Sequence, residues 1–302
     1  MSARPLLAGL RRLVLAAPAV WLLLFFLAPL ALVLKIALST PAIAQPPYEP
    51  RFDIADGLVV LWEKVQGLSF DTFALVISDE LYLSAYLSSL RLAAIATLVT
   101  LCVAFPLAHA MTRAPRHWRS ALILLAIAPF WTSFLIRIYA WIMLLKDEGL
   151  INKVLLTLGF ISSPFHIFPS DGAVLIGIVY SYLPFMILPL YTALEKQDPA
   201  LIEAAGDLGA TPLSAFWCIT VPLARPGIFA GLLLVFIPAV GEFVIPDLLG
   251  GSDTLMIGRT LWSEFFDNRD WPTASSVAIL LLALLIAPIM IYERQQMKET
   301  AQ

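Results

Sequence analysis

Long apolar segments separated by short polar connections make up most of this 302-residue sequence. A helix needs about 20 largely apolar residues to cross a bilayer, and six segments reach that length. The pattern therefore predicts an all-α membrane protein with six transmembrane helices. The six expected spans are residues 13–37, 87–111, 119–145, 173–194, 227–248 and 274–292.

The first apolar segment has two interpretations. Arg11 and Arg12 precede it and Ala42-Ile43-Ala44 resembles a cleavage site, as in a secretory signal peptide. Its apolar run, however, is about twice as long as the apolar core of such a peptide. We therefore expect an uncleaved first transmembrane helix.

The distribution of lysine and arginine predicts the orientation. These residues gather in alternate connections, which places those connections and both termini in the cytoplasm. The first external loop, residues 38–86, instead holds only Arg51 and Lys64 against seven carboxylates. Such a face attracts cations, although the avoidance of positive charge in translocated loops explains the same asymmetry. The cations assigned to the cytoplasm are Arg4, Arg11, Arg12, Arg113, Arg116, Arg119, Lys196, Arg225, Arg294 and Lys298.

The external loop has structure of its own in this interpretation. Four prolines at its start favour an extended chain. Residues 54–66 and 71–85 then have the apolar spacing of helices. We expect two short helices at the membrane surface.

Composition agrees with a membrane protein. Hydrophobic residues make up 60% of the chain, charged residues 14%, and the mean hydropathy is +0.86. A soluble domain is nearer half apolar and a quarter charged. The two cysteines, Cys102 in an expected span and Cys218 in an expected cytoplasmic loop, are not placed to form a disulfide.

The sequence offers no set of residues for catalysis. His109, His117 and His166 are not spaced as metal ligands. There is no phosphate-binding loop of the kind that holds ATP. No cofactor is expected in this chain, and any ATP that drives it must be hydrolysed by another subunit.

The loop at residues 195–226 carries its own helix signals. Asp198 before Pro199 and Thr211 before Pro212 are typical helix starts. Gly209 is a typical helix stop. Two short helices with a tight break are therefore expected, the second of them ending at Pro222. The expected faces are Leu201, Ala204, Ala205 and Leu208 on one side and Glu203 and Asp207 on another.

Charged residues at membrane depth are the candidates for a transport pathway. Arg137 lies among Trp131 and Tyr139 in the third span, and Glu242 and Asp247 lie in the fifth. Gly241 and two prolines interrupt the fifth helix near these carboxylates. Carboxylates beside aromatic rings and opened backbone can hold an ammonium group. The alternative is an ion pair from Arg137 to either carboxylate that only joins two helices.

The loop resembles a known motif. Permease subunits of type I ABC importers carry a cytoplasmic loop of the form E-A-A, three residues, G, nine residues, I, any residue, L-P. Glu203, Ala204, Ala205, Gly209, Ile219 and Pro222 match it in spacing, and Val221 replaces the usual leucine. The resemblance implies that this loop docks on an ATPase subunit and transmits its motion.

Three further stretches, residues 129–141, 241–251 and 265–272, resemble the polyamine branch of that family, particularly its putrescine-type permeases. The resemblance implies a bacterial inner-membrane assembly of two related permeases, two ATPase subunits that bind ATP and Mg²⁺, and an external polyamine-binding protein. ATP-driven closure of the ATPases would then switch the permeases between inward- and outward-facing states.

The expected organisation has three parts. Residues 1–84 hold the amino terminus, the first span and the external loop, residues 85–292 form the permease core, and residues 293–302 form a cytoplasmic tail. The favoured function is polyamine import. The alternatives are another small solute, such as an amino-acid-like or iron-chelate cargo, and a secondary transporter or channel that works without partners.

Overall fold

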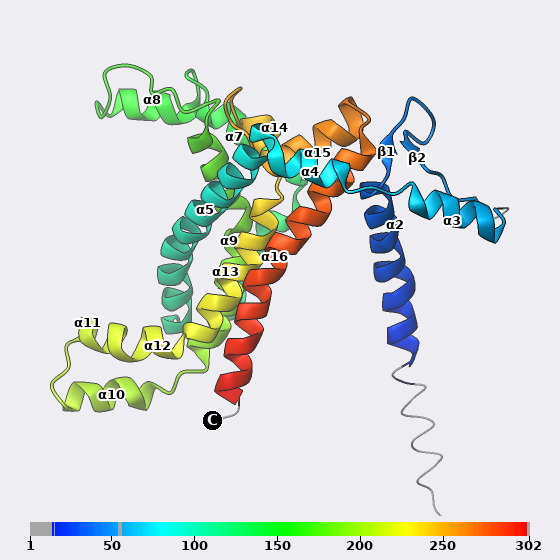
Figure 1. The fold of residues 1–302 in the computed structure, drawn as a ribbon. Helices are drawn as coiled ribbons and strands as arrows, with labels where there is room; N and C mark the ends of the chain where they lie inside the picture. Colours follow the sequence, from blue (N-terminus) through cyan, green and yellow to red (C-terminus); the bar gives the residue numbers. More distant parts are fainter. Residues whose placement is uncertain (1–13, 15, 54–55, 301–302) are drawn as a thin grey trace, which may run out of the picture. The chain divides into compact units, whose positions relative to one another are not determined.

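The computed structural model describes the backbone of residues 14, 16–53 and 56–300, and their side chains except at 58 and 291–300. The chain is almost entirely helical, as predicted, and its only strands in this described part are a two-residue pair (Figure 1). It forms two compact units. The predicted cytoplasmic cations Arg4, Arg11 and Arg12 lie outside the described residues, as do the side chains of Arg294 and Lys298.

The first unit comprises residues 1–83 and 261–284. The carbonyl of Ala37, the last residue of the helix Ala28–Ala37, accepts hydrogen bonds from the buried hydroxyls of Thr72 (2.5 Å) and Ser276 (3.1 Å). These bonds satisfy a helix-end carbonyl that would otherwise be unpaired. The elements are η1 (Leu23–Leu27), α2 (Ala28–Ala37), β1 (Thr40–Pro41), β2 (Tyr48–Glu49), α3 (Leu58–Gln66), α4 (Asp71–Ser78) and η4 (Ser263–Asp267).

The two helices expected at residues 54–66 and 71–85 are confirmed as α3 and α4, but α3 begins only at Leu58, and α4 is also shorter than predicted. Helix α4 ends at Ser78 because Asp79 takes an extended conformation and accepts a hydrogen bond from the Leu81 N–H at 2.8 Å. Asp79 thereby caps α5 (Glu80–Arg113), the 34-residue helix that continues into the second unit. The second expected span therefore begins before residue 87.

The second unit comprises residues 84–260 and 285–302. Its other elements are α6 (Arg116–Ile127), η2 (Ala128–Trp131), α7 (Phe134–Leu145), α8 (Leu150–Thr157), α9 (Asp171–Glu195), α10 (Pro199–Asp207), α11 (Pro212–Ala215), η3 (Phe216–Thr220), α12 (Val221–Leu223), α13 (Arg225–Val240) and α14 (Val244–Leu249). Helices α15 (Ile257–Trp262) and α16 (Trp271–Thr300) each contribute to both units.

Helices α9 and α13 form the centre of the second unit. A Cβ on Gly227 would lie 2.5 Å from the Cβ of Ala193, and one on Gly231 would lie 2.5 Å from the sulfur of Met186. Glycines one turn apart thus allow the two helices to approach closely, as is common in membranes. Buried side chains of α5 join this contact, among them Ala104 and Ala108.

Four helices in the described part are long and apolar enough to cross a membrane, and two bent helix pairs raise the number to as many as six. The third expected span is not straight, because its two halves meet at 89°. The break falls at Thr132 and Ser133, which are extended and follow a short 3₁₀ turn that contains Pro129. The fifth expected span also ends early, at Val240.

Candidate functional site

Residues 197–224 form a helical hairpin at one end of α5, α9 and α13, and α14 lies at the other end of these helices (Figure 1). We call this segment the hairpin. Both predicted starts are confirmed: the Asp198 carboxylate accepts from the Ala200 N–H at 3.0 Å, and the Thr211 hydroxyl from the Ser214 N–H at 3.2 Å. Each cap satisfies an N–H at a helix start that lacks a partner within the helix.

The turn of the hairpin depends on Gly209, which has a φ of +87°. The Gly209 N–H donates to the Gly206 carbonyl and the Ala210 N–H to the Ala205 carbonyl, both at 2.9 Å. This is the hydrogen-bond pattern of a helix that ends on a left-handed residue. The second arm continues through η3, a π-helical turn containing Ile219, and passes Pro222 to end at Leu223, one residue later than predicted.

The predicted faces of α10 do not specify which side of the helix packs. Ile202 and Gly206, one turn apart, face the rest of the second unit, whereas Leu208 is 90% exposed. A helix of nine residues has too few positions for its apolar pattern to specify one face. Glu203 and Asp207 are both exposed, and Ala204 is exposed as well.

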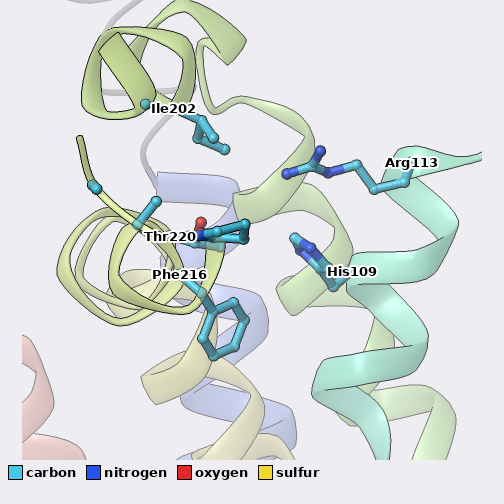
Figure 2. A pocket seen from close by; sticks show the side chains of 9 residues that line it. His109, Arg113, Ile202, Phe216 and Thr220 are labelled. Atoms are coloured by element: carbon cyan, nitrogen blue, oxygen red, sulfur yellow. The ribbon is translucent and has the colours of Figure 1, made fainter. Parts of the chain in front are cut away.

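A cleft of about 500 Å³ separates the hairpin from the end of α5. Figure 2 shows His109 and Arg113 projecting from α5 towards Ile202 on one arm and Phe216 and Thr220 on the other. The ring of Phe216 packs edge-on against Phe105 and His109, with centroids 5.5 and 5.9 Å apart. The second arm is therefore anchored on α5.

The hairpin also presents large apolar side chains to its surroundings. Leu213 is 68% exposed and Trp217 is 62% exposed, in addition to Leu208. Side chains of this size on a polar connection are typical of a surface that a partner covers. The exposed carboxylate of Glu203 lies on the same hairpin.

Helix α13 joins the hairpin to the candidate pathway residues. It begins at Arg225, directly after the hairpin, and ends at Val240. The predicted break follows at Gly241, which confirms that part of the sequence analysis. A Cβ on Gly258 would lie 2.4 Å from the Gly241 carbonyl oxygen and 2.6 Å from that of Glu242, so α15 packs directly against the break.

The carboxylate of Glu242 is nearly buried, with 9% of the residue exposed. It accepts a hydrogen bond of 2.5 Å from the Tyr182 hydroxyl and bonds of 3.1 and 3.4 Å from the N–H groups of Val244 and Ile245. It therefore caps the first turn of α14. None of the salt bridges of the described residues supplies it with a cation.

Arg137 does not form the ion pair with either carboxylate that the sequence analysis left as an alternative. Asp247 instead pairs with Arg259, whose Nε lies 3.3 Å from its Oδ1. The Arg137 guanidinium lies over the rings of Phe130 (5.2 Å) and Phe134 (5.6 Å), and within the described structure its buried Nε has no hydrogen-bond partner. This geometry favours a structural role for Asp247.

The two aromatic candidates of the third span lie at the surface of the unit. Trp131 is 77% exposed and Tyr139 is 54% exposed. A row of rings instead runs from Arg137 to Glu242: Phe130 packs edge-on against Phe185 (5.2 Å), and Phe185 lies 6.0 Å from Tyr182. Sequence reasoning missed Phe130, Phe185 and Arg259, although their positions within or beside expected spans were a signal.

A second group that sequence reasoning used only for orientation lies beside the hairpin. Arg113, Arg116 and Arg119 line a cleft of about 440 Å³ together with Glu195 and Glu203. Their three-residue spacing across the turn between α5 and α6 was a signal for such a cluster.

Comparison with known proteins gives one consistent result. The chain matches, over residues 3–294, the family described as "Binding-protein-dependent transport system inner membrane component". The spermidine/putrescine transport system permease protein PotB of Haemophilus influenzae is 38% identical over 280 residues, or 91% of this chain and 90% of that protein. The protein of the same name from Escherichia coli is 44% identical over 216 residues, or 72% and 78%.

A more distant relative, the inner membrane ABC transporter permease protein YdcU of Escherichia coli, is 32% identical and covers 76% of this chain and 81% of its own length. Among solved structures, a chain of a bacterial alginate ABC transporter in complex with an alginate pentasaccharide-bound periplasmic protein has a TM-score of 0.69. It is 16% identical and covers 97% of this chain and 95% of its own, and therefore shows the shared fold alone. The chain thus belongs to the family of inner membrane components of binding-protein-dependent transport systems, the permeases of type I ABC importers, and it is a transporter component rather than an enzyme.

Proposed function

We propose that this chain is the permease subunit of an ATP-driven importer of polyamines, with putrescine as its main cargo. Two relatives that cover most of the chain are named as spermidine/putrescine permeases. The observation that carries the proposal is the nearly buried carboxylate of Glu242, which accepts three hydrogen bonds but has no cation beside it in the described part of the chain.

The surroundings of Glu242 suit an ammonium group. A buried carboxylate without a cationic partner attracts a positive charge strongly, because water screens it little. The rings of Tyr182 and Phe185 add cation–π attraction of about 0.5–2 kcal/mol. In this proposal Glu242 contacts one end of the diamine on the pathway, and Arg137, Trp131 and Tyr139 line other parts of it.

The hairpin supplies the energy coupling in this proposal. Glu203, Ala204, Ala205, Gly209, Ile219 and Pro222 form the segment that docks on an ATPase subunit. The exposed Leu208, Leu213 and Trp217 support such a contact, since they add apolar area to the hairpin that carries Glu203. The ATPase pair binds ATP and Mg²⁺, and the hairpin transmits its closure through α13.

The complete assembly comprises this chain, a second related permease, two ATPase subunits and an external polyamine-binding protein. The alginate transporter structure, which contains a periplasmic protein, supports this composition by analogy of fold. Both termini and the hairpin lie in the cytoplasm of a bacterium, as the distribution of arginine and lysine favours.

A competition assay tests the cargo. A strain that lacks this subunit should lose uptake of radiolabelled putrescine and regain it with the wild-type chain. Unlabelled putrescine should compete more strongly than spermidine. Equal competition would leave polyamine import standing and overturn the preference, whereas unchanged putrescine uptake in the deleted strain would overturn the cargo.

Charge reversal tests the coupling role. Glu203→Lys should abolish uptake and disconnect ATP hydrolysis from transport, while the protein still inserts in the membrane. Asp207→Lys is the matched control, because it reverses a second exposed carboxylate of the hairpin that lies outside the motif, and it should retain uptake. Normal uptake by Glu203→Lys would overturn the docking role.

Two alternatives have their own tests. If the cargo is a different small solute, the deleted strain should lose uptake of that radiolabelled solute, and unlabelled putrescine should not compete with it in the wild-type strain. A secondary transporter would move its solute in proteoliposomes that contain this chain alone and an ion gradient, without any ATPase subunit.

A further inference from the structure

The cleft beside the hairpin has an unbalanced set of charges. Arg119 already has partners in the structure. Its Nη1 lies 3.7 Å from a carboxylate oxygen of Glu195, and its Nε donates to the Ala114 carbonyl at 3.0 Å. Glu195 also accepts a hydrogen bond of 2.8 Å from the hydroxyl of Tyr191. Within the described residues, Arg113 and Arg116 form no ion pair, and only the Glu203 carboxylate remains unpaired on the same cleft.

The cleft lies at a membrane boundary. Arg113 is the last residue of α5, a helix long and apolar enough to cross the bilayer, and Arg116 begins α6, the first half of a bent span. Trp118, which directly precedes Arg119, is 57% exposed. Tryptophan and arginine side by side are typical of the level at which lipid headgroups lie.

We propose that Arg113 and Arg116 bind the phosphodiester of an anionic phospholipid in this cleft, between the α5–α6 turn and the hairpin. Arginine presents a planar fork of N–H donors that matches two phosphate oxygens. Basic pockets between membrane helices on the cytoplasmic side are suited to such headgroups. Leu194 and Ile202 on the far wall offer apolar contact to the glycerol and the first methylenes of the chains.

The bound headgroup has a consequence for the hairpin. Without it, the two arginines attract the carboxylate of Glu203, which lines the same cleft. With it, their charge is neutralised and Glu203 is available to a partner. The lipid therefore favours the docked state, and this consequence rests on the proposed coupling role of the hairpin.

Lipid retention tests the binding itself, independently of transport. The complete complex is purified from nanodiscs of phosphatidylcholine with phosphatidylglycerol, and retained lipids are counted by native mass spectrometry. The wild-type complex should retain phosphatidylglycerol in preference to phosphatidylcholine. The double variant Arg113→Gln with Arg116→Gln should bind it about twenty-fivefold more weakly, roughly fivefold for each arginine.

Matched variants distinguish a specific effect of the cleft arginines from a general effect of losing positive charge. Arg225→Gln removes an exposed cation that lines neither cleft and should leave retention unchanged. The double variant Arg113→Lys with Arg116→Lys keeps both positive charges but loses the planar set of N–H donors. It should retain an amount of phosphatidylglycerol between those of the wild-type complex and the double glutamine variant. Absence of any preference in the wild-type complex, or equal retention by the double glutamine variant, would overturn the proposal.

The rate of ATP hydrolysis is a second measurement. It distinguishes a lipid headgroup from free phosphate and tests whether the bound lipid affects coupling. Phosphatidylglycerol should stimulate ATP hydrolysis of the wild-type complex, and inorganic phosphate should neither stimulate it nor displace the lipid. Stimulation by inorganic phosphate alone would assign the cleft to a free anion and overturn the lipid site. Retention without stimulation would keep the site and remove only its link to the coupling role.

Discussion

The hydroxyl of Tyr182 on α9 donates a hydrogen bond of 2.5 Å to the carboxylate of Glu242, sixty residues later in the chain. The same carboxylate receives the N–H groups of Val244 and Ile245. Glu242 is therefore held in one position between α9 and the start of α14. This fixed carboxylate is the group on which the proposed cargo specificity depends.

Two substitutions separate the structural and transport roles of Glu242. Tyr182→Phe removes a hydrogen bond to a charged group and should lower the free energy of unfolding by about 1.5–3 kcal/mol. Glu242→Gln keeps a hydrogen-bond acceptor but removes the charge, so it should reduce putrescine uptake more than thermal stability. Thermal unfolding of the purified complex and initial uptake rates provide both measurements.

The control for this pair is Asp247→Asn. It removes the ion pair to Arg259, in which both side chains are exposed, and should cost at most about 1 kcal/mol. If Glu242→Gln left uptake kinetics unchanged with a full complement of complex in the membrane, Glu242 would be a helix cap and nothing more.

Gly209 and Gly206 provide a matched test of the hairpin turn. Gly209→Ala places a side chain at a φ of +87°, which costs about 1–2 kcal/mol. Gly206→Ala meets no atom within 4 Å and should instead favour the helix by up to about 1 kcal/mol. The first variant should therefore lose part of its coupled uptake and the second should keep it. Equal uptake by both would mean that the turn geometry is unimportant.

The crossing of α9 and α13 is sensitive to a single side chain. Gly227→Val would force the helices apart, because even a Cβ lies 2.5 Å from Ala193 and 2.6 Å from the Pro189 carbonyl oxygen. Overpacking of this kind costs about 1–3 kcal/mol or more. The thermal midpoint of the complex should fall, whereas Gly172→Ala, which meets only Ser170 at 3.4 Å, should leave it unchanged.

The loop at residues 38–86 should respond to acid through Asp56. A hydrogen bond from Lys64 at 2.6 Å, and then one from the Asp53 N–H, lower the pKa of Asp56. A carboxyl with a lowered pKa stabilises the fold above its unfolded pKa, about 3.9, and this contribution is lost as the pH falls through the lower, folded pKa. The resistance of the loop to proteolysis should therefore stay constant down to about pH 5. It should fall only below about pH 4.

Lys64→Met tests that assignment, because it returns the pKa of Asp56 towards its ordinary value. The loop of the variant should then be less resistant to proteolysis at neutral pH than that of the wild-type chain. Its resistance should also fall less in acid, because a carboxyl with the same pKa in the folded and unfolded states adds no pH dependence to stability. Glu63→Gln, which changes the neighbouring exposed charge, is the control and should leave the profile where it was. An identical profile for Lys64→Met would show that the ion pair does not hold the loop.

Much of the fold follows from local sequence signals. Asp198, Thr211 and Gly209 predict the hairpin correctly, because capping and left-handed turns depend on a few neighbouring residues. Gly241 likewise predicts the break before Glu242. The long apolar segments predict the helices, since span length is a property of composition.

Other features depend on tertiary contacts that no local pattern contains. The packed face of α10 is set by the cleft against α5, and a nine-residue helix does not reveal it. Arg259 reaches Asp247 from a different helix, so that the Arg137 pair suggested by the sequence does not form. The 89° break in the third span arises where Thr132 and Ser133 leave the helix, although proline alone suggests only a kink.

Helix α13 runs without interruption from the hairpin to the break at Gly241, about 24 Å for its 16 residues. Its bending stiffness is not uniform along that length. Gly227 and Gly231 hold the amino-terminal half of the helix against α9, and Pro238 removes a backbone hydrogen bond near its carboxyl-terminal end. Compliance is therefore concentrated in the last turn, so that a displacement applied at the hairpin is converted into bending directly before Glu242.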